Sequence, residues 1–222
     1  MKKSVVGLAV AVFIGAGYPQ ARAAVLVQYD FTGNSDVAST VHANTTATDF
    51  FAGPGITVGF SANGNPAPSR SVDASTTGAT QDDNDGFGFT LTADSGFLLN
   101  LNTFTLTFDA LNVDSSVGNQ TANWAVRTSV LGFAVNIGTG TFDENGTAVS
   151  MTFTGAEYDG LTSIEVRLYM WDPNGSQEML FDNVTLNGAV SVIPEPVNVA
   201  LGVFGLCAVG FAVGRRYLRK RV

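Results

Sequence analysis

Alternation of apolar and polar residues in short segments is the feature that most restricts the fold of this 222-residue chain. The clearest segment is residues 163–171, in which the alternate apolar positions are Ile164, Val166, Leu168 and Met170. Residues 99–108 alternate in the same way, with one slip near Asn102-Thr103 that a β-bulge explains. A period of two puts the apolar side chains on one face of a strand. The pattern therefore predicts half-buried β-strands.

Similar segments follow one another along the chain, separated by stretches rich in glycine, asparagine and aspartate. The predicted strands are residues 25–31, 56–60, 69–74, 87–92, 99–108, 124–130, 133–137, 149–153, 163–171 and 179–187. Residues 32–54 are polar and predict a long surface connection with at most a short strand. We therefore expect an all-β body over residues 24–190: a two-sheet antiparallel sandwich like a jelly roll.

The first 23 residues have the three parts of a secretory signal peptide. A basic start is followed by the apolar run 5–16, which is too short to span a bilayer. Ala21 and Ala23 then form an A-x-A site, which predicts cleavage before Ala24. We expect the chain to meet the export translocon and signal peptidase.

A second hydrophobic segment, residues 197–214, lies near the C-terminus and holds no charge. As a helix it would span about 27 Å, close to the roughly 30 Å hydrocarbon core of a bilayer. The basic tail 215–222 follows, with the cations Arg215, Arg216, Arg219, Lys220 and Arg221. Positive flanks stay on the cytoplasmic side. The segment is therefore predicted to be a transmembrane helix, with the body outside the inner membrane.

The tripeptide Pro194-Glu195-Pro196 lies directly before this helix, within the motif 193–196. A Pro-Glu-Pro motif, one hydrophobic helix and an arginine-rich end make residues 191–222 resemble the PEP-CTERM sorting signal of bacterial surface proteins. The resemblance implies that a membrane-embedded exosortase recognises and cleaves the tail. It also implies delivery to the outer surface or the extracellular polysaccharide of Gram-negative bacteria. The alternative is an ordinary C-terminal anchor whose prolines end a strand.

The charge of residues 24–196 differs strongly from the value of −8 for the whole chain. This part contains all nineteen acidic residues against three cations, Arg70, Arg127 and Arg167, so that its net charge is −16. Nucleic-acid binding is excluded, because it needs cations against phosphate. The acidic body suits solubility outside the cell and can attract divalent cations. Cys207, the only cysteine, lies in the hydrophobic segment, so the body forms no disulfide.

Two acidic places are candidates for a structural Ca²⁺, which prefers oxygen ligands. The first is the loop with Asp82, Asp83 and Asp85, for which a solvated turn is the alternative. The second is Asp30 with Asp182. The closing strands resemble those of carbohydrate-binding or lectin-like jelly rolls, and that resemblance implies a calcium between the first and last strands. Hydrogen bonding of Asp182 to backbone near a strand end is the alternative.

Trp171 and Tyr169 lie on the predicted polar face of segment 163–171, where their flat rings could stack on sugars. Packing of these rings in the core or at an edge is the alternative.

Catalysis by this chain has little support in the sequence. Glu157 and Asp159 match the start of an E-x-D-x-x-E signature of glycan hydrolases, but the third acid is missing. The sole histidine, His42, has no accompanying nucleophile motif and is expected at the surface.

These features predict an exported, non-enzymatic surface or extracellular-matrix protein, first anchored in the inner membrane and then processed by an exosortase. A structural or adhesive role in exopolysaccharide or biofilm is the leading hypothesis. A glycan-binding, lectin-like module is the alternative, and a polysaccharide hydrolase is a distant one.

Overall fold

The computed structural model describes residues 23–61, 69–73, 79–113, 121–172 and 178–193, together with residues 204, 205 and 207. The predicted Pro194-Glu195-Pro196 motif, nearly all of the hydrophobic segment 197–214, the basic tail and nearly all of the predicted signal peptide lie outside these residues. In the described part of the chain, no helix is both long enough and apolar enough to cross a bilayer.

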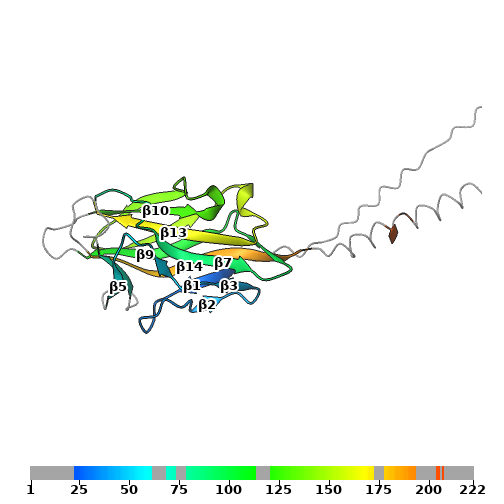
Figure 1. The fold of residues 1–222 in the computed structure, drawn as a ribbon, viewed down its shortest axis with the longest axis horizontal. Helices are drawn as coiled ribbons and strands as arrows, with labels where there is room; N and C mark the ends of the chain where they lie inside the picture. Colours follow the sequence, from blue (N-terminus) through cyan, green and yellow to red (C-terminus); the bar gives the residue numbers. More distant parts are fainter. Residues whose placement is uncertain are drawn as a thin grey trace, which may run out of the picture.

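Two antiparallel sheets pack face to face and run along the long axis of the body (Figure 1). The first sheet has the order β12 (Thr147–Thr152), β9 (Thr105–Val113), β14 (Glu178–Val192), β1 (Ala24–Tyr29) and β2 (Thr40–Val41). Strands β8 (Phe97–Asn100) and β6 (Ser69–Asp73) also pair with β14, and β5 (Val58–Ser61) pairs with β6.

The second sheet has the order β11 (Gly138–Phe142), β10 (Ala122–Thr128), β13 (Ser163–Trp171), β7 (Phe87–Ala93) and β3 (Thr45–Ala47). Strand β4 (Phe51–Ala52) also pairs with β7, and two short 3₁₀ helices, η1 (Ser129–Leu131) and η2 (Ala156–Tyr158), lie in connections. The predicted all-β, two-sheet antiparallel sandwich is confirmed.

The core fills the space between the sheets with the apolar side chains of the alternating segments. In β13 the predicted core positions, Ile164, Val166, Leu168 and Met170, are at most 1% exposed. Aromatic rings dominate one part of the core, where Phe87 stacks on Phe181 with ring centroids 4.5 Å apart. Such pairs add to the stability gained from apolar burial.

Strand β14 organises the first sheet, because it pairs with β1, β6, β8 and β9. Its register with β9 shifts between Asp182 and Thr185, at a bulge where Asn183 has a φ of 50°. On the other side Tyr29 of β1 pairs with Val184. The first and last strands are therefore neighbours, as predicted, and Asp30 follows next to the bulge.

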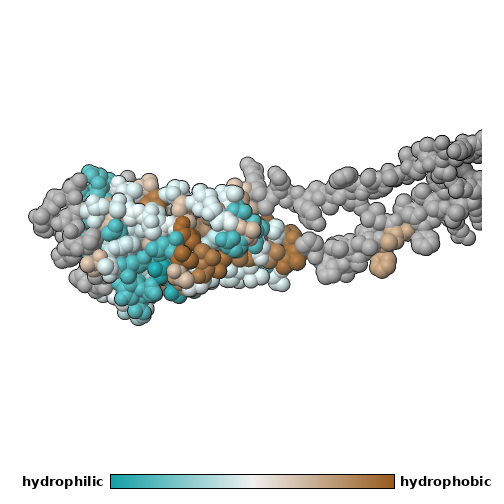
Figure 2. Space-filling model, turned by 90° about the horizontal axis from the view of Figure 1, so that it is seen from above, coloured by the Kyte–Doolittle hydropathy of each residue, from teal (hydrophilic) through white to brown (hydrophobic). Residues whose placement is uncertain are grey.

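The end of β14 and the end of β13 lie at opposite ends of the sandwich. β14 ends beside β8, and Leu99 of β8 bridges to Leu161, just before β13 begins. The last residue of β13, Trp171, therefore lies at the opposite end of the sandwich from the last residue of β14, Val192. Figure 1 shows the strands β13 and β14 in this arrangement. Figure 2 shows apolar surface in the middle of the body and at its right-hand end. Val192 and Ile193, at the end of β14, are 67% and 42% exposed.

Three predicted elements were wrong. Residues 133–137 are not a strand but part of the turn after η1, because Gly132 and Phe133 both have positive φ angles, 59° and 58°. Residues 99–108 are not one strand, since β8 ends at Asn100 and β9 begins at Thr105. The slip in the alternation marks this break. The polar connection 32–54 contains three short strands rather than at most one.

Candidate functional site

The outer face of the second sheet carries most of the candidate residues. In β13 the side chains that alternate with the core positions belong to Glu165, Arg167, Tyr169 and Trp171. In β10, Asn123 pairs with Trp171, Ala125 with Tyr169, and Arg127 with Arg167. Two of the three arginines of the body therefore lie side by side with the aromatic residues of β13.

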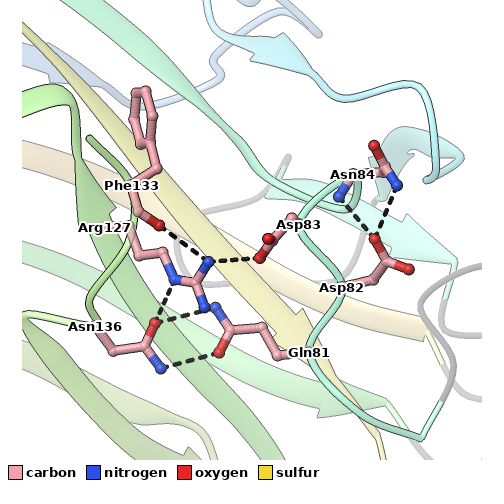
Figure 3. Close-up of polar contacts among 7 residues, drawn as sticks. All are labelled: Gln81, Asp82, Asp83, Asn84, Arg127, Phe133 and Asn136. Atoms are coloured by element: carbon pink, nitrogen blue, oxygen red, sulfur yellow. Dashed lines mark hydrogen bonds and ion pairs between the residues drawn. The ribbon is translucent and has the colours of Figure 1, made fainter.

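Arg127 is the centre of a hydrogen-bonded cluster on this face (Figure 3). Its Nη1 donates to Asp83 Oδ1 at 2.5 Å and to the carbonyl of Phe133 at 3.1 Å. Its Nε donates to Asn136 Oδ1 at 2.6 Å, and the amides of Asn136 and Gln81 hydrogen-bond to each other at 2.9 Å. These contacts hold the acidic loop and the β10–β11 turn against the sheet.

Tyr169 lies beneath this cluster and is only 1% exposed. The Arg127 guanidinium carbon is 5.2 Å from the centroid of its ring, a cation–π contact. A Cβ added to Gly86 would lie 3.0 Å from ring carbons, so the backbone of the acidic loop also packs on the ring. The prediction of sugar stacking on Tyr169 needs correction, because these contacts leave no room for a sugar.

Trp171 is half-buried and lies at the end of β13. Asn123 and then Thr141 of the edge strand β11 are its neighbours across the sheet. One indole next to an amide and a hydroxyl makes a mixed apolar and polar surface. The other tryptophan, Trp124, points into the core, where its ring meets Phe108 edge to face at 5.5 Å.

Phe133 covers the middle of the same face. The guanidinium carbon of Arg167 lies 3.8 Å from the centroid of its ring, and Arg167 Nε donates to Glu165 Oε1 at 2.6 Å. The sequence prediction missed the positions of Phe133, Asn136 and Gln81, because these residues reach the site from connections. The one signal in the sequence for this cluster was Arg167, an arginine on the polar face of the alternating segment 163–171.

The acidic loop uses its carboxylates in contacts within the protein. Asp82 Oδ1 accepts hydrogen bonds from the backbone N–H and the side-chain amide of Asn84, at 2.8 and 3.0 Å, and Asp83 pairs with Arg127 (Figure 3). Burial raises the pKa of Asp85, and Asp82 raises it further. In the described part of the chain, no three His, Cys, Asp or Glu side chains are grouped to hold a metal ion.

A second acidic group lies on the outer face of the first sheet. Asp182 is 2% exposed, and its Oδ1 accepts from the backbone N–H of Asn183 at 2.7 Å. Asn183 Nδ2 donates to Asp109 Oδ2 at 3.0 Å, and Asp109 pairs with Asp182 across β9 and β14. Burial, together with the charges of Asp109 and Asp30, raises the pKa of Asp182 to about 6.

The structure thus brings Asp30 near Asp182, as the pairing of the first and last strands predicted. Asp30 Oδ1 accepts from the backbone N–H of Thr32 at 3.1 Å, and Asp182 makes the predicted bond to backbone. Calcium at this place stays a prediction. Asp109 was not foreseen, because only the register of β9 against β14 places it beside Asp182.

The residues considered for catalysis lie apart from both groups. Glu157 and Asp159 flank the buried Tyr158 at η2, and Asp159 Oδ2 accepts from Asn102 Nδ2 at 3.2 Å. His42 is half-buried, and its Nδ1 accepts from the backbone N–H of Asn44 at 3.3 Å.

Comparison with known proteins found similarity among solved structures. No protein-family model and no curated protein matches the chain. A family 22 carbohydrate-binding module of Clostridium thermocellum Xyn10B is 12% identical, with 77% of this chain and 97% of that chain covered and a TM-score of 0.40. The xylan-binding domain of Paenibacillus barcinonensis Xyn10C is also 12% identical, with coverages of 79% and 98% and a TM-score of 0.43.

A family 11 carbohydrate-binding module of Clostridium thermocellum, solved with a β-1,3-1,4-mixed-linked tetrasaccharide, is 16% identical. Its alignment covers 75% of this chain and 98% of that chain, with a TM-score of 0.39. At these identities and TM-scores, neither the ligands of these proteins nor the roles of their residues can be assigned to this chain.

Proposed function

We propose that this chain is an exported, non-enzymatic β-sandwich that binds glycans at the outer face of its second sheet. The observation that carries the proposal is the half-buried Trp171, which pairs across the sheet with Asn123, which in turn pairs with Thr141 of β11. A flat indole packs against the C–H face of a sugar ring. The amide and the hydroxyl can exchange hydrogen bonds with sugar hydroxyls, as the few polar groups of a binding site do.

The charges near this surface favour a neutral glycan. The two arginines of the face already have carboxylate partners, since Arg127 pairs with Asp83 and Arg167 with Glu165. The body as a whole carries a net charge of −16, which repels anionic polysaccharides at long range. A neutral polysaccharide meets no such barrier, so neutral glucans and xylans are the first ligands to test.

The position of Trp171 also suits a protein of the cell surface. The described body ends at Ile193, and Trp171 lies at the other end of the sandwich. A nine-residue strand such as β13 spans about 27 Å from its first to its last residue. A glycan-binding surface at that end would face away from a membrane that holds the C-terminal segment.

Sorting by an exosortase is the second part of the proposal. Its support is the order of Pro194-Glu195-Pro196, the uncharged residues 197–214 and the five cations after them. In this proposal the precursor is anchored in the inner membrane and then reaches the cell surface or the extracellular matrix. Glycan binding there would give it an adhesive role in exopolysaccharide.

A pull-down of the full chain, kept in detergent, on insoluble xylan and mixed-linked β-glucan tests the glycan site. We expect Trp171→Ala to weaken binding by about tenfold or more, because central aromatic residues dominate such sites. Trp171→Phe should retain part of it. Val135→Ala is the matched control, because Val135 is 53% exposed and lies outside the site. Unchanged binding by Trp171→Ala, at an unchanged melting temperature, would show that the proposal is wrong.

A further inference from the structure

A cavity of about 300 Å³ opens on the outer face of the first sheet, on the other side of the sandwich from Trp171. It lies over β9 and β14 and beside the turn between β11 and β12. The lining residues that matter here are Asp109, Leu111, Asn145, Ala148, Leu180 and Asp182.

The register of the strands arranges these side chains in two rows. Leu180 pairs with Leu111, and two residues along the strands Asp182 pairs with Asp109. Ala148 of β12 pairs with Asp109 from the other side. One part of the cavity is therefore apolar, and the adjacent part carries two carboxylates.

The two carboxylates lack a positive partner among the described residues. The ion pairs of Arg127 with Asp83 and of Arg167 with Glu165 are on the other sheet. Asp182 is 2% exposed, and its Oδ2 has no hydrogen-bond partner in the described part of the chain. A buried carboxylate that has one oxygen without a donor and no counter-charge is costly. A ligand that brings a cationic donor would remove that cost.

The shape of the site distinguishes an organic cation from a metal ion. Calcium needs six to eight oxygen ligands at about 2.3–2.6 Å. This cavity instead has leucine walls, and the described residues contain no group of three acidic, His or Cys side chains that could hold a metal. A volume of about 300 Å³ accommodates one sugar ring.

We propose that this cavity binds an amino-sugar residue with an unsubstituted amine, whose ammonium group is held by Asp182 and Asp109. The C–H face of the ring packs on Leu111 and Leu180, and Asn145 at the turn hydrogen-bonds a hydroxyl. The inference rests on the proposed function in taking a glycan as the ligand. It adds a second site, on the opposite sheet and with a different sugar chemistry.

Titration calorimetry of the full chain in detergent, near neutral pH, tests the proposal with glucosamine, N-acetylglucosamine, glucose and butylamine. We expect saturable binding of glucosamine, and at least about tenfold weaker binding of the other three, which lack either the charge or the ring. Asp182→Asn and Asp109→Asn should each weaken glucosamine by about tenfold. Glu144→Gln is the matched control, because it removes an exposed charge from the same turn without lining the cavity.

The outcomes separate this site from the Trp171 surface. Glucosamine binding that falls with Asp182→Asn but not with Trp171→Ala supports the cavity, even if the neutral-glycan proposal fails. Glucosamine binding that is absent, or equal in Asp182→Asn and in the Glu144→Gln control, would overturn the cavity proposal. So would butylamine or N-acetylglucosamine binding as tightly as glucosamine. None of these results bears on neutral-glycan binding by Trp171.

Discussion

Asp182 shows how a single buried carboxyl can work against stability at neutral pH. Its pKa of about 6 in the folded chain lies above the value of about 4 expected in an unfolded chain. The folded state therefore binds the proton more tightly. The resulting stability is fully present below about pH 4 and is lost as the pH rises toward 6.

Asp182→Asn should therefore raise the melting temperature above pH 6 and change it little below pH 4. Asparagine keeps an acceptor for the N–H of Asn183 and removes the charge beside Asp109. Thermal unfolding of the full chain with a chelator, across this pH range, measures the effect. A variant that melts below the wild type at neutral pH would contradict the account. A rise in the wild-type melting temperature on adding calcium would support the calcium prediction for Asp30 and Asp182, and would count against an ammonium site at Asp182.

Strand β13 illustrates which elements could be predicted from the sequence. Its strict alternation predicted both the strand and which residues lie on each of its two faces, so the outward position of Trp171 was predicted. Strand β11 was missed because it reads Gly-Thr-Gly-Thr-Phe. Its glycines are required by a distant residue, since a Cβ on Gly140 would lie 2.7 Å from Nε1 of Trp124. Such a reason cannot be seen in the local sequence.

The polar cluster around Arg127 was unpredictable for the same physical reason. Its partners come from two connections, and Asp83 is 44 residues away along the chain. The apolar residues near Phe133 suggested a strand. In the fold, Phe133 instead packs against Arg167 from a turn with positive φ angles.

Gly88→Ala tests the close contact between β7 and β13. A Cβ at this position would come within van der Waals overlap of the Val166 carbonyl oxygen, which is backbone and cannot move aside. We expect a loss of about 1–3 kcal/mol or more, and about 2–4 °C in melting temperature for each kcal/mol. Thr92→Ala, at an exposed position of the same strand, is the control. Equal melting temperatures for the two variants would contradict the packing described for this pair of strands.

At the scale of the molecule, the two predicted processing sites flank one compact sandwich. β1 begins at Ala24, the predicted first residue of the mature chain, and pairs there with Gly188 of β14. The two described ends of the body are therefore at the same end of the sandwich. The proposed glycan surface at Trp171 lies at the other end, where it could reach polymer outside the membrane if the chain is anchored as proposed.

Mass spectrometry of the protein from native cells tests the sorting proposal. We expect a mature product that has lost the basic tail and ends near Pro196, because the proposed exosortase cleavage would remove the hydrophobic segment. A product that keeps the end at residues 219–222 would show a permanent membrane anchor instead. In that case the glycan-binding proposal would stand, and only the final location would change.

The central claim, that a glycan contacts Trp171, can be observed directly through the two indole N–H signals in an NMR titration with a soluble xylan or β-glucan oligosaccharide. The signal that disappears in Trp171→Ala should shift saturably with ligand, while the Trp124 signal, from a ring in the core, should stay in place. Shifts of neither signal, or of the Trp124 signal alone, would contradict the account.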